Sequence, residues 1–122
     1  MVLRILFLIS FLVALLFAQT PYEKGKKLYL QNGCGNCHGR NLEGMHKYPY
    51  LANRAKGFME YKLKRFRSKL SDTQQQEMMI PFAVGLSDED IENLAIYMNE
   101  FVPEKNSKKY DDSFKQEGSG SS

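Results

Sequence analysis

The chain has 122 residues, with 17 lysines and arginines, 14 aspartates and glutamates, and a formal net charge of +3 at pH 7. This length corresponds to one domain with a modest hydrophobic core of its own. The small net charge does not suggest a nucleic-acid partner. The sequence contains neither an internal repeat nor a glycine-rich phosphate loop, so nucleotide-binding and repeat proteins are not indicated.

The first 18 residues have the pattern of a secretory signal peptide. Arg4 provides the positive charge, an apolar run covers residues 5–17, and Ala18 is a small residue suited to cleavage. The run is shorter than the roughly 20 apolar residues that span a membrane, so removal is favoured over a retained anchor. We therefore expect export to the periplasm, a folded domain over residues 19–103, and a disordered tail of charged, serine and glycine residues over 104–122.

The first helix of the domain is expected to begin near Thr20. Thr20 is a suitable N-cap, Pro21 suits the first helical position, and Glu23 follows three residues after the cap. Gly33 is expected to end the helix, because glycine readily adopts the left-handed conformation of a helix C-terminus. The chain then enters its most informative motif directly.

Residues 34–38 read Cys-Gly-Asn-Cys-His, which is the attachment pattern of a c-type haem. The thiols of Cys34 and Cys37 can each add across one haem vinyl group. The imidazole of His38 then lies next to them as the proximal ligand of the iron. These are the only two cysteines of the chain, so the motif predicts one covalently bound haem c, with its iron, per chain.

A Cys-x-x-Cys pair has three other uses in proteins. A thioredoxin-like redox centre requires a strand–helix–strand context that the sequence does not show. A zinc site lacks ligands, because His38 and His46 are the only histidines and His38 adjoins Cys37. A local disulfide of a secreted protein remains open on the motif alone. As a lone histidine in a loop, His46 is expected to be exposed rather than to bind iron.

The rest of the chain is expected to be mainly helical. Residues 39–53 are expected to form a loop, and a helix over residues 55–70 has a core stripe of Met59, Leu63, Phe66 and Leu70. Residues 71–77 are expected to form a polar loop, and Pro81 keeps the apolar segment 78–85 from being a plain helix interior. A last helix starts at the cap Ser87, ends before Pro103, and faces inward with Ile91, Leu94, Ala95, Met98 and Phe101.

A methionine is expected to fill the sixth position of the iron. A thioether ligand stabilises ferrous iron and raises the reduction potential, as an electron carrier requires. Met78 and Met79 lie on the segment that follows the second helix. Neighbouring side chains diverge, so only one of the two can reach the iron, and the residues alone leave the choice open.

With these motifs, residues 22–102 resemble the class I cytochromes c, in particular the bacterial cytochrome c4 and c553-like group. The resemblance rests on residues 34–39, on Tyr-Pro-Tyr-Leu-Ala at 48–52, and on residues 78–97, all in the expected order. It implies an all-α fold with three main helices and loops around one covalently attached haem. It also implies thioethers at Cys34 and Cys37, His38 as proximal ligand, and Met79 as the second ligand, with Met78 as the alternative.

The resemblance implies two further contacts, and the sequence departs from the family pattern in two respects. It implies that the Pro49 carbonyl accepts a hydrogen bond from the proximal histidine, and that the first and last helices cross at Gly25 with Tyr97 opposite. The family often has Leu-Ala-Gly-Gln where this chain has Leu-Ala-Asn-Arg at residues 51–54. The c4 proteins carry two haem domains, whereas this chain has one haem motif and is therefore similar to a single-domain relative.

Charge is distributed unevenly along the domain. Residues 54–69 are rich in lysine and arginine with a single acid, Glu60, whereas residues 87–104 contain acids and no base. This asymmetry predicts either a dipole that orients the molecule toward redox partners or simply a solvated helix face.

These observations predict a monohaem c-type cytochrome. It would carry single electrons between periplasmic or membrane-bound redox proteins of a respiratory chain, such as oxidase or reductase complexes. No constellation of acid, base and nucleophile is evident, so neither an enzyme nor a small-molecule substrate is expected. The alternatives are a ligand-binding or peroxidase-like haem protein with an open sixth position, a thiol oxidoreductase, and an anchored subunit of a larger oxidase or dehydrogenase.

Overall fold

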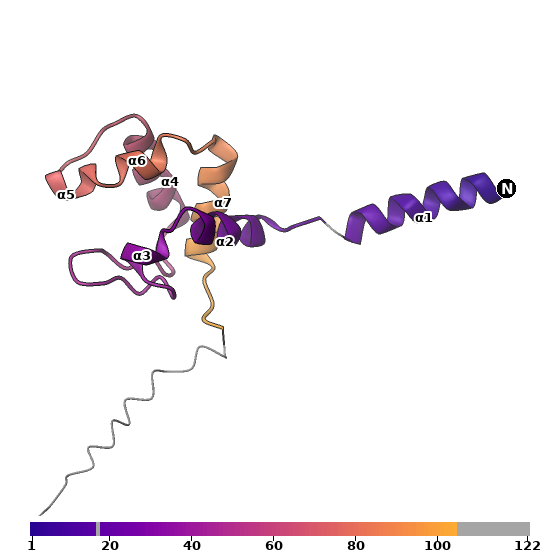
Figure 1. Ribbon diagram of the computed structural model, residues 1–122, viewed down its shortest axis with the longest axis horizontal. Helices are drawn as coiled ribbons and strands as arrows, with labels where there is room; N and C mark the ends of the chain where they lie inside the picture. The colour runs from indigo at the N-terminus through magenta and orange to yellow at the C-terminus, as the bar shows by residue number, and fades with distance from the viewer. Residues whose placement is uncertain (17, 105–122) are drawn as a thin grey trace, which may run out of the picture.

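A computed structural model of the protein describes residues 1–16 and 18–104, so the expected tail lies outside the described residues apart from Glu104. The elements in chain order are α1 (Val2–Leu16), α2 (Pro21–Gln31), α3 (Gly35–His38), α4 (Lys56–Arg67), α5 (Gln74–Glu77), α6 (Ile80–Ala83) and α7 (Asp88–Asn99) (Figure 1). In these ranges the structure has no strand, and its one β-bridge joins Met45 to Tyr48. The all-α prediction is confirmed.

The core lies where α2 and α4 pack against α7. Helices α2 and α7 cross in close contact at Gly25, as expected. A β-carbon added at Gly25 would lie 2.0 Å from the backbone oxygen of Asn93 and 2.8 Å from Cβ of Tyr97. Only glycine lets the two helices approach this closely.

The expected caps form at both of these helices. The side chain of Thr20 accepts a hydrogen bond from the backbone N–H of Glu23 at the start of α2. At the start of α7, the Ser87 hydroxyl accepts from the N–H of Asp90 at 3.0 Å, and the Asp90 carboxylate accepts from the N–H of Ser87 at 2.9 Å. This reciprocal capping box fixes the first turn of α7.

Helix α4 is shorter than expected. Its core stripe of Met59, Leu63 and Phe66 is buried as predicted. The helix ends at Arg67, however, and Lys69 adopts a positive φ of 61° that turns the chain. The side chain of Leu70 is consequently 52% exposed, so its assignment to the core was wrong.

Two short helices occupy segments that were expected to be irregular. The prediction of loop was wrong for Gln74–Glu77, because Thr73 caps them by accepting from the N–H of Gln76, and glutamine and glutamate are good helix formers. Helix α6 places Pro81 in its first turn, where the missing N–H costs no helical hydrogen bond. In Figure 1, α5 and α6 lie above α3 and the loop that follows it.

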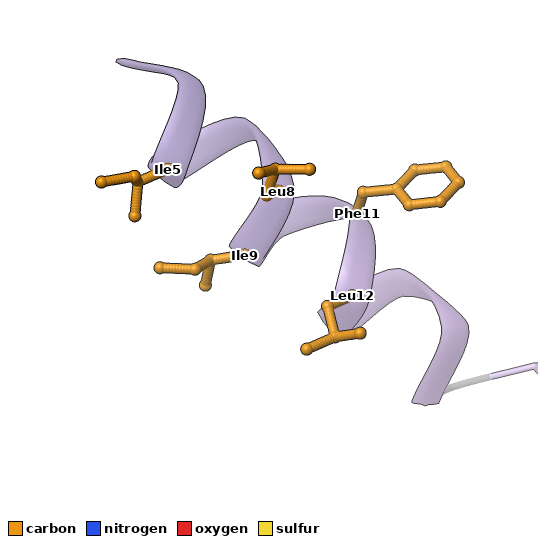
Figure 2. A pocket seen from close by; sticks show the side chains of 5 residues that line it. All are labelled: Ile5, Leu8, Ile9, Phe11 and Leu12. Atoms are coloured by element: carbon orange, nitrogen blue, oxygen red, sulfur yellow. The ribbon is translucent and has the colours of Figure 1, made fainter. Parts of the chain in front are cut away.

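The segment expected to be a signal peptide forms α1, and the side chains of residues 1–14 are exposed. A shallow apolar hollow runs along this helix and is lined by Ile5, Leu8, Ile9, Phe11 and Leu12 (Figure 2). It belongs to a single exposed helix, so we do not regard it as a ligand site. Over residues 1–16 and 18–104, no helix is both long enough and apolar enough to cross a membrane.

The basic and acidic segments meet across the α4–α7 contact. Lys56 lies 3.1 Å from Glu92, and the guanidinium of Arg67 lies 2.6 Å from the carboxylate of Asp88. Arg67 also donates to the backbone carbonyl of Leu86, just before α7. These pairs neutralise part of the charge separation that the sequence suggested.

Candidate haem-binding site

The two cysteines lie on one helical turn. Cys34 is the N-cap of α3 and Cys37 lies within it, and the N–H of His38 donates to the carbonyl of Cys34 at 3.0 Å. Residues three apart on a helix are neighbours on its surface. Their spacing therefore places Cys34 and Cys37 on the same side of the turn, as attachment to one planar macrocycle requires, and both cysteines are free and partly buried. This short helix was not predicted from the sequence.

The ring of His38 is held by a single hydrogen bond. His38 is 6% exposed, and its Nδ1 lies 2.8 Å from the carbonyl oxygen of Pro49, the contact that the resemblance implied. A carbonyl can only accept, so Nδ1 carries the proton and donates. In the neutral imidazole the lone pair then lies on Nε2, which makes no hydrogen bond within the described part of the chain. The arrangement leaves Nε2 available as an iron ligand.

Tyr29 of α2 fixes the haem motif to the core. Its side chain is fully buried, and its hydroxyl donates to the carbonyl of Gly39 at 2.6 Å. A β-carbon on Gly35 would lie 3.5 Å from the Tyr29 ring, so α3 rests directly on that ring. Burial raises the pKa of Tyr29 well above its ordinary value, so the hydroxyl remains a hydrogen-bond donor.

The two methionines differ in environment. Met78 is 52% exposed, whereas Met79 is partly buried and packs against the core. The backbone N–H of Met79 donates to the carbonyl of Gln76 at 3.0 Å, so α5 positions it. Met79 is therefore the more enclosed of the two methionines. His46 is exposed, as expected of a lone histidine in a loop.

The structure does not support the alternative uses of the two cysteines. Burial raises the pKa of the Cys34 thiol, whereas a nucleophilic thiol needs a lowered pKa. Both cysteines are free rather than joined in a disulfide. Among the residues that the structure describes, no group of three histidine, cysteine or acidic side chains is arranged to hold a metal ion such as zinc.

One partly buried cationic side chain has a donor that a haem could use. The Arg65 guanidinium donates to Asp72 at 2.5 Å through one terminal nitrogen. Its Nε is, over residues 1–16 and 18–104, the one buried side-chain polar atom without a hydrogen-bond partner. A buried donor is rarely left unsatisfied, and a haem propionate is an anion that could accept from it. The two thiols, the available imidazole nitrogen and a methionine thioether fit the groups that would hold haem c.

Comparison with known proteins gives the same result. The sequence profile of the cytochrome c family matches residues 22–101, which include the haem motif, both methionines, helices α3 to α7 and all of α2 except Pro21. The chain belongs to the cytochrome c family. Its cofactor is therefore covalently bound haem c, and its general role is that of the family, the transport of single electrons.

The relatives found among characterised proteins agree with this assignment. Cytochrome c-554(547) of Halothiobacillus neapolitanus is 33% identical over 82 residues, 61% of this chain and 89% of the relative. Cytochrome c-554(548) of Halomonas halodenitrificans is 35% identical over 65 residues, 52% of this chain and 78% of the relative. The thiosulfate dehydrogenase electron acceptor of Stutzerimonas stutzeri is 33% identical over 90 residues, 66% of this chain but 40% of the longer relative.

Proposed function

We propose that this cytochrome c is an exported monohaem carrier whose iron is bound by His38 and Met79, with thioether links at Cys34 and Cys37. The observation that carries the proposal is the hydrogen bond from His38 Nδ1 to the Pro49 carbonyl, which orients the ring and leaves Nε2 free. The partial burial of Met79, beside the exposed Met78, supports the choice of the second ligand.

The chain's own residues have a limited chemical task in this function. The haem supplies the one-electron chemistry, and the protein tunes and shields it. Donation from Nδ1 of His38 makes Nε2 a better ligand. A thioether from Met79 would favour the reduced state of the iron and would exclude small molecules from it. Arg65, through its unpartnered Nε, would neutralise a propionate.

The proposed location is the periplasm. Residues 1–18 have the charge, apolar run and small terminal residue of a signal peptide, and covalent haem attachment in the systems that this chain resembles takes place outside the cytoplasm. We propose that residues 19–103 are the mature domain.

The proposed partners are other redox proteins of a respiratory chain, such as membrane oxidase or reductase complexes, and not small-molecule substrates. One relative is named as the electron acceptor of a thiosulfate dehydrogenase, which supports a donor of the dehydrogenase class. No catalytic acid, base or nucleophile is needed for this role, so we propose a carrier rather than an enzyme.

The decisive experiment replaces each methionine by alanine in protein matured in a periplasm. In the wild type we expect a low-spin spectrum that carbon monoxide does not change, and a methionine-to-ferric-iron charge-transfer band. Met79→Ala should lose the band and bind carbon monoxide, while Met78→Ala should keep both properties. Loss of the band only in Met78→Ala would make Met78 the ligand. Immediate carbon monoxide binding by the wild type would instead indicate an open sixth position and refute the carrier function.

A further inference from the structure

Helix α5 is tied to two different parts of the molecule. On one side, Nζ of Lys62 on α4 donates to the side-chain oxygen of Gln76 at 3.2 Å and to Asp72 at 3.1 Å. On the other side, Nε2 of Gln75 donates to the backbone carbonyl of Lys47 at 2.7 Å. The short helix therefore links α4 to the turn at residues 45–48.

That turn leads directly to the histidine side of the site. The N–H of Met45 donates to the carbonyl of Tyr48 at 3.2 Å, and the N–H of Tyr48 donates back to the carbonyl of Met45 at 2.8 Å. The next residue is Pro49, whose carbonyl accepts from His38. The Lys47 carbonyl that Gln75 contacts is thus two residues before the Pro49 carbonyl that orients the His38 ring.

The other end of α5 leads directly to the methionine side. The N–H of Met79 donates to the carbonyl of Gln76 at 3.0 Å, and the N–H of Met78 donates to that of Gln75 at 3.4 Å. Within residues 1–16 and 18–104, the Gln75–Lys47 contact is the single hydrogen bond between segment 71–79 and segment 38–53. The segments that carry the two candidate iron ligands, His38 and Met79, are therefore joined through the side chain of Gln75.

We propose that Gln75 is a positioning residue that holds the Met79 segment against the segment that orients His38, and so limits how often the methionine leaves the iron. The inference rests on the proposed ligation by Met79. Gln75 is exposed, so the bond is of ordinary strength. An ordinary net hydrogen-bond contribution predicts that its loss accelerates methionine dissociation about 2- to 10-fold.

Imidazole binding to the ferric holoprotein measures this dissociation. At saturating imidazole the observed rate becomes constant and equals the rate at which methionine leaves. Gln75→Ala should raise this limiting rate, and Gln75→Lys should restore it because lysine keeps a donor of similar reach. The matched control is Gln74→Ala, whose side chain is exposed on the same helix and makes no hydrogen bond in the described residues. An unchanged rate in Gln75→Ala, or an equal rise in Gln74→Ala, would overturn the proposal.

A second readout does not depend on the iron. Amide hydrogen exchange at Met79, whose N–H is bonded to Gln76, should accelerate in Gln75→Ala while the denaturant midpoint of global unfolding stays unchanged. A fall in global stability that accounts for the faster exchange would mean a general structural role and would refute positioning. If imidazole binding to the wild type never reaches a limiting rate, ligation by Met79 fails, and hydrogen exchange still decides whether Gln75 holds the segment.

Discussion

The helix crossing at Gly25 gives the sharpest test of the fold. In Gly25→Ala, the added methyl carbon would lie 2.0 Å from the Asn93 oxygen, 2.6 Å from its carbonyl carbon and 2.8 Å from Cβ of Tyr97. An ordinary contact is at least 3.4 Å. Two of these atoms belong to the α7 backbone and cannot rotate away, so α2 must move more than about 1 Å from α7.

This displacement has a predictable cost. Overpacking a close contact typically destabilises by about 1–3 kcal/mol. The clash here is with backbone, and separation of α2 from α7 also loosens the buried side chains of Tyr29 and Tyr97, so we expect the upper part of that range. Alanine offsets about 0.5–1 kcal/mol by favouring the helix over glycine. The net loss should be about 2 kcal/mol, or roughly a 30-fold change in the unfolding equilibrium.

Urea unfolding of the holoprotein, followed by circular dichroism, measures this loss. The matched control is Gly57→Ala on α4, where a β-carbon meets nothing within 4 Å. The control should be unchanged or up to about 1 kcal/mol more stable. A Gly25→Ala protein as stable as the wild type would show that α2 and α7 do not cross as closely as described.

Two other predictions concern charge. The Arg67 guanidinium hydrogen-bonds Asp88 and holds the pKa of that carboxyl below its ordinary value. Asp88→Asn should therefore reduce the free energy of unfolding above about pH 4. The difference from the wild type should vanish as the pH falls and Asp88 is protonated. An equal difference in unfolding free energy at pH 3 and pH 7 would contradict this. Arg65→Gln should lower the haem reduction potential, because a nearby cation favours the reduced iron, whereas Lys64→Gln, an exposed charge on the same helix, should change it less. If voltammetry shows the same change in reduction potential for both variants, Arg65 does not lie near the haem.

Local signals explain which expectations succeeded. The caps at Thr20 and Ser87 and the glycine at the end of α2 act within a few residues, so they are visible in sequence and are confirmed. The end of α4 depends instead on the left-handed turn at Lys69, for which lysine gives no signal. Helix α5 was missed because four polar residues have no apolar period, although Thr73 caps them.

In the candidate site, too, local features could be predicted from the sequence and long-range contacts could not. The Cys-Gly-Asn-Cys-His motif names the cofactor because its chemistry is contained in five consecutive residues. That the Nε of Arg65 lacks a hydrogen-bond partner could not be predicted from the sequence. Residues 54–69 contain several lysines and arginines, and nothing local distinguishes one from another until their neighbours in space are known. The Gln75–Lys47 bond is likewise invisible, because it joins residues 28 positions apart.

The sequence by itself determined the family, the haem c cofactor and the order of the main helices, because short-range motifs and helical periodicity encode them. Only the tertiary structure decided which charges pair, that Met79 rather than Met78 lies against the core, and that α5 connects the two sides of the site. The physical reason is that burial and long-range hydrogen bonds arise when distant segments meet, and no local pattern specifies that meeting.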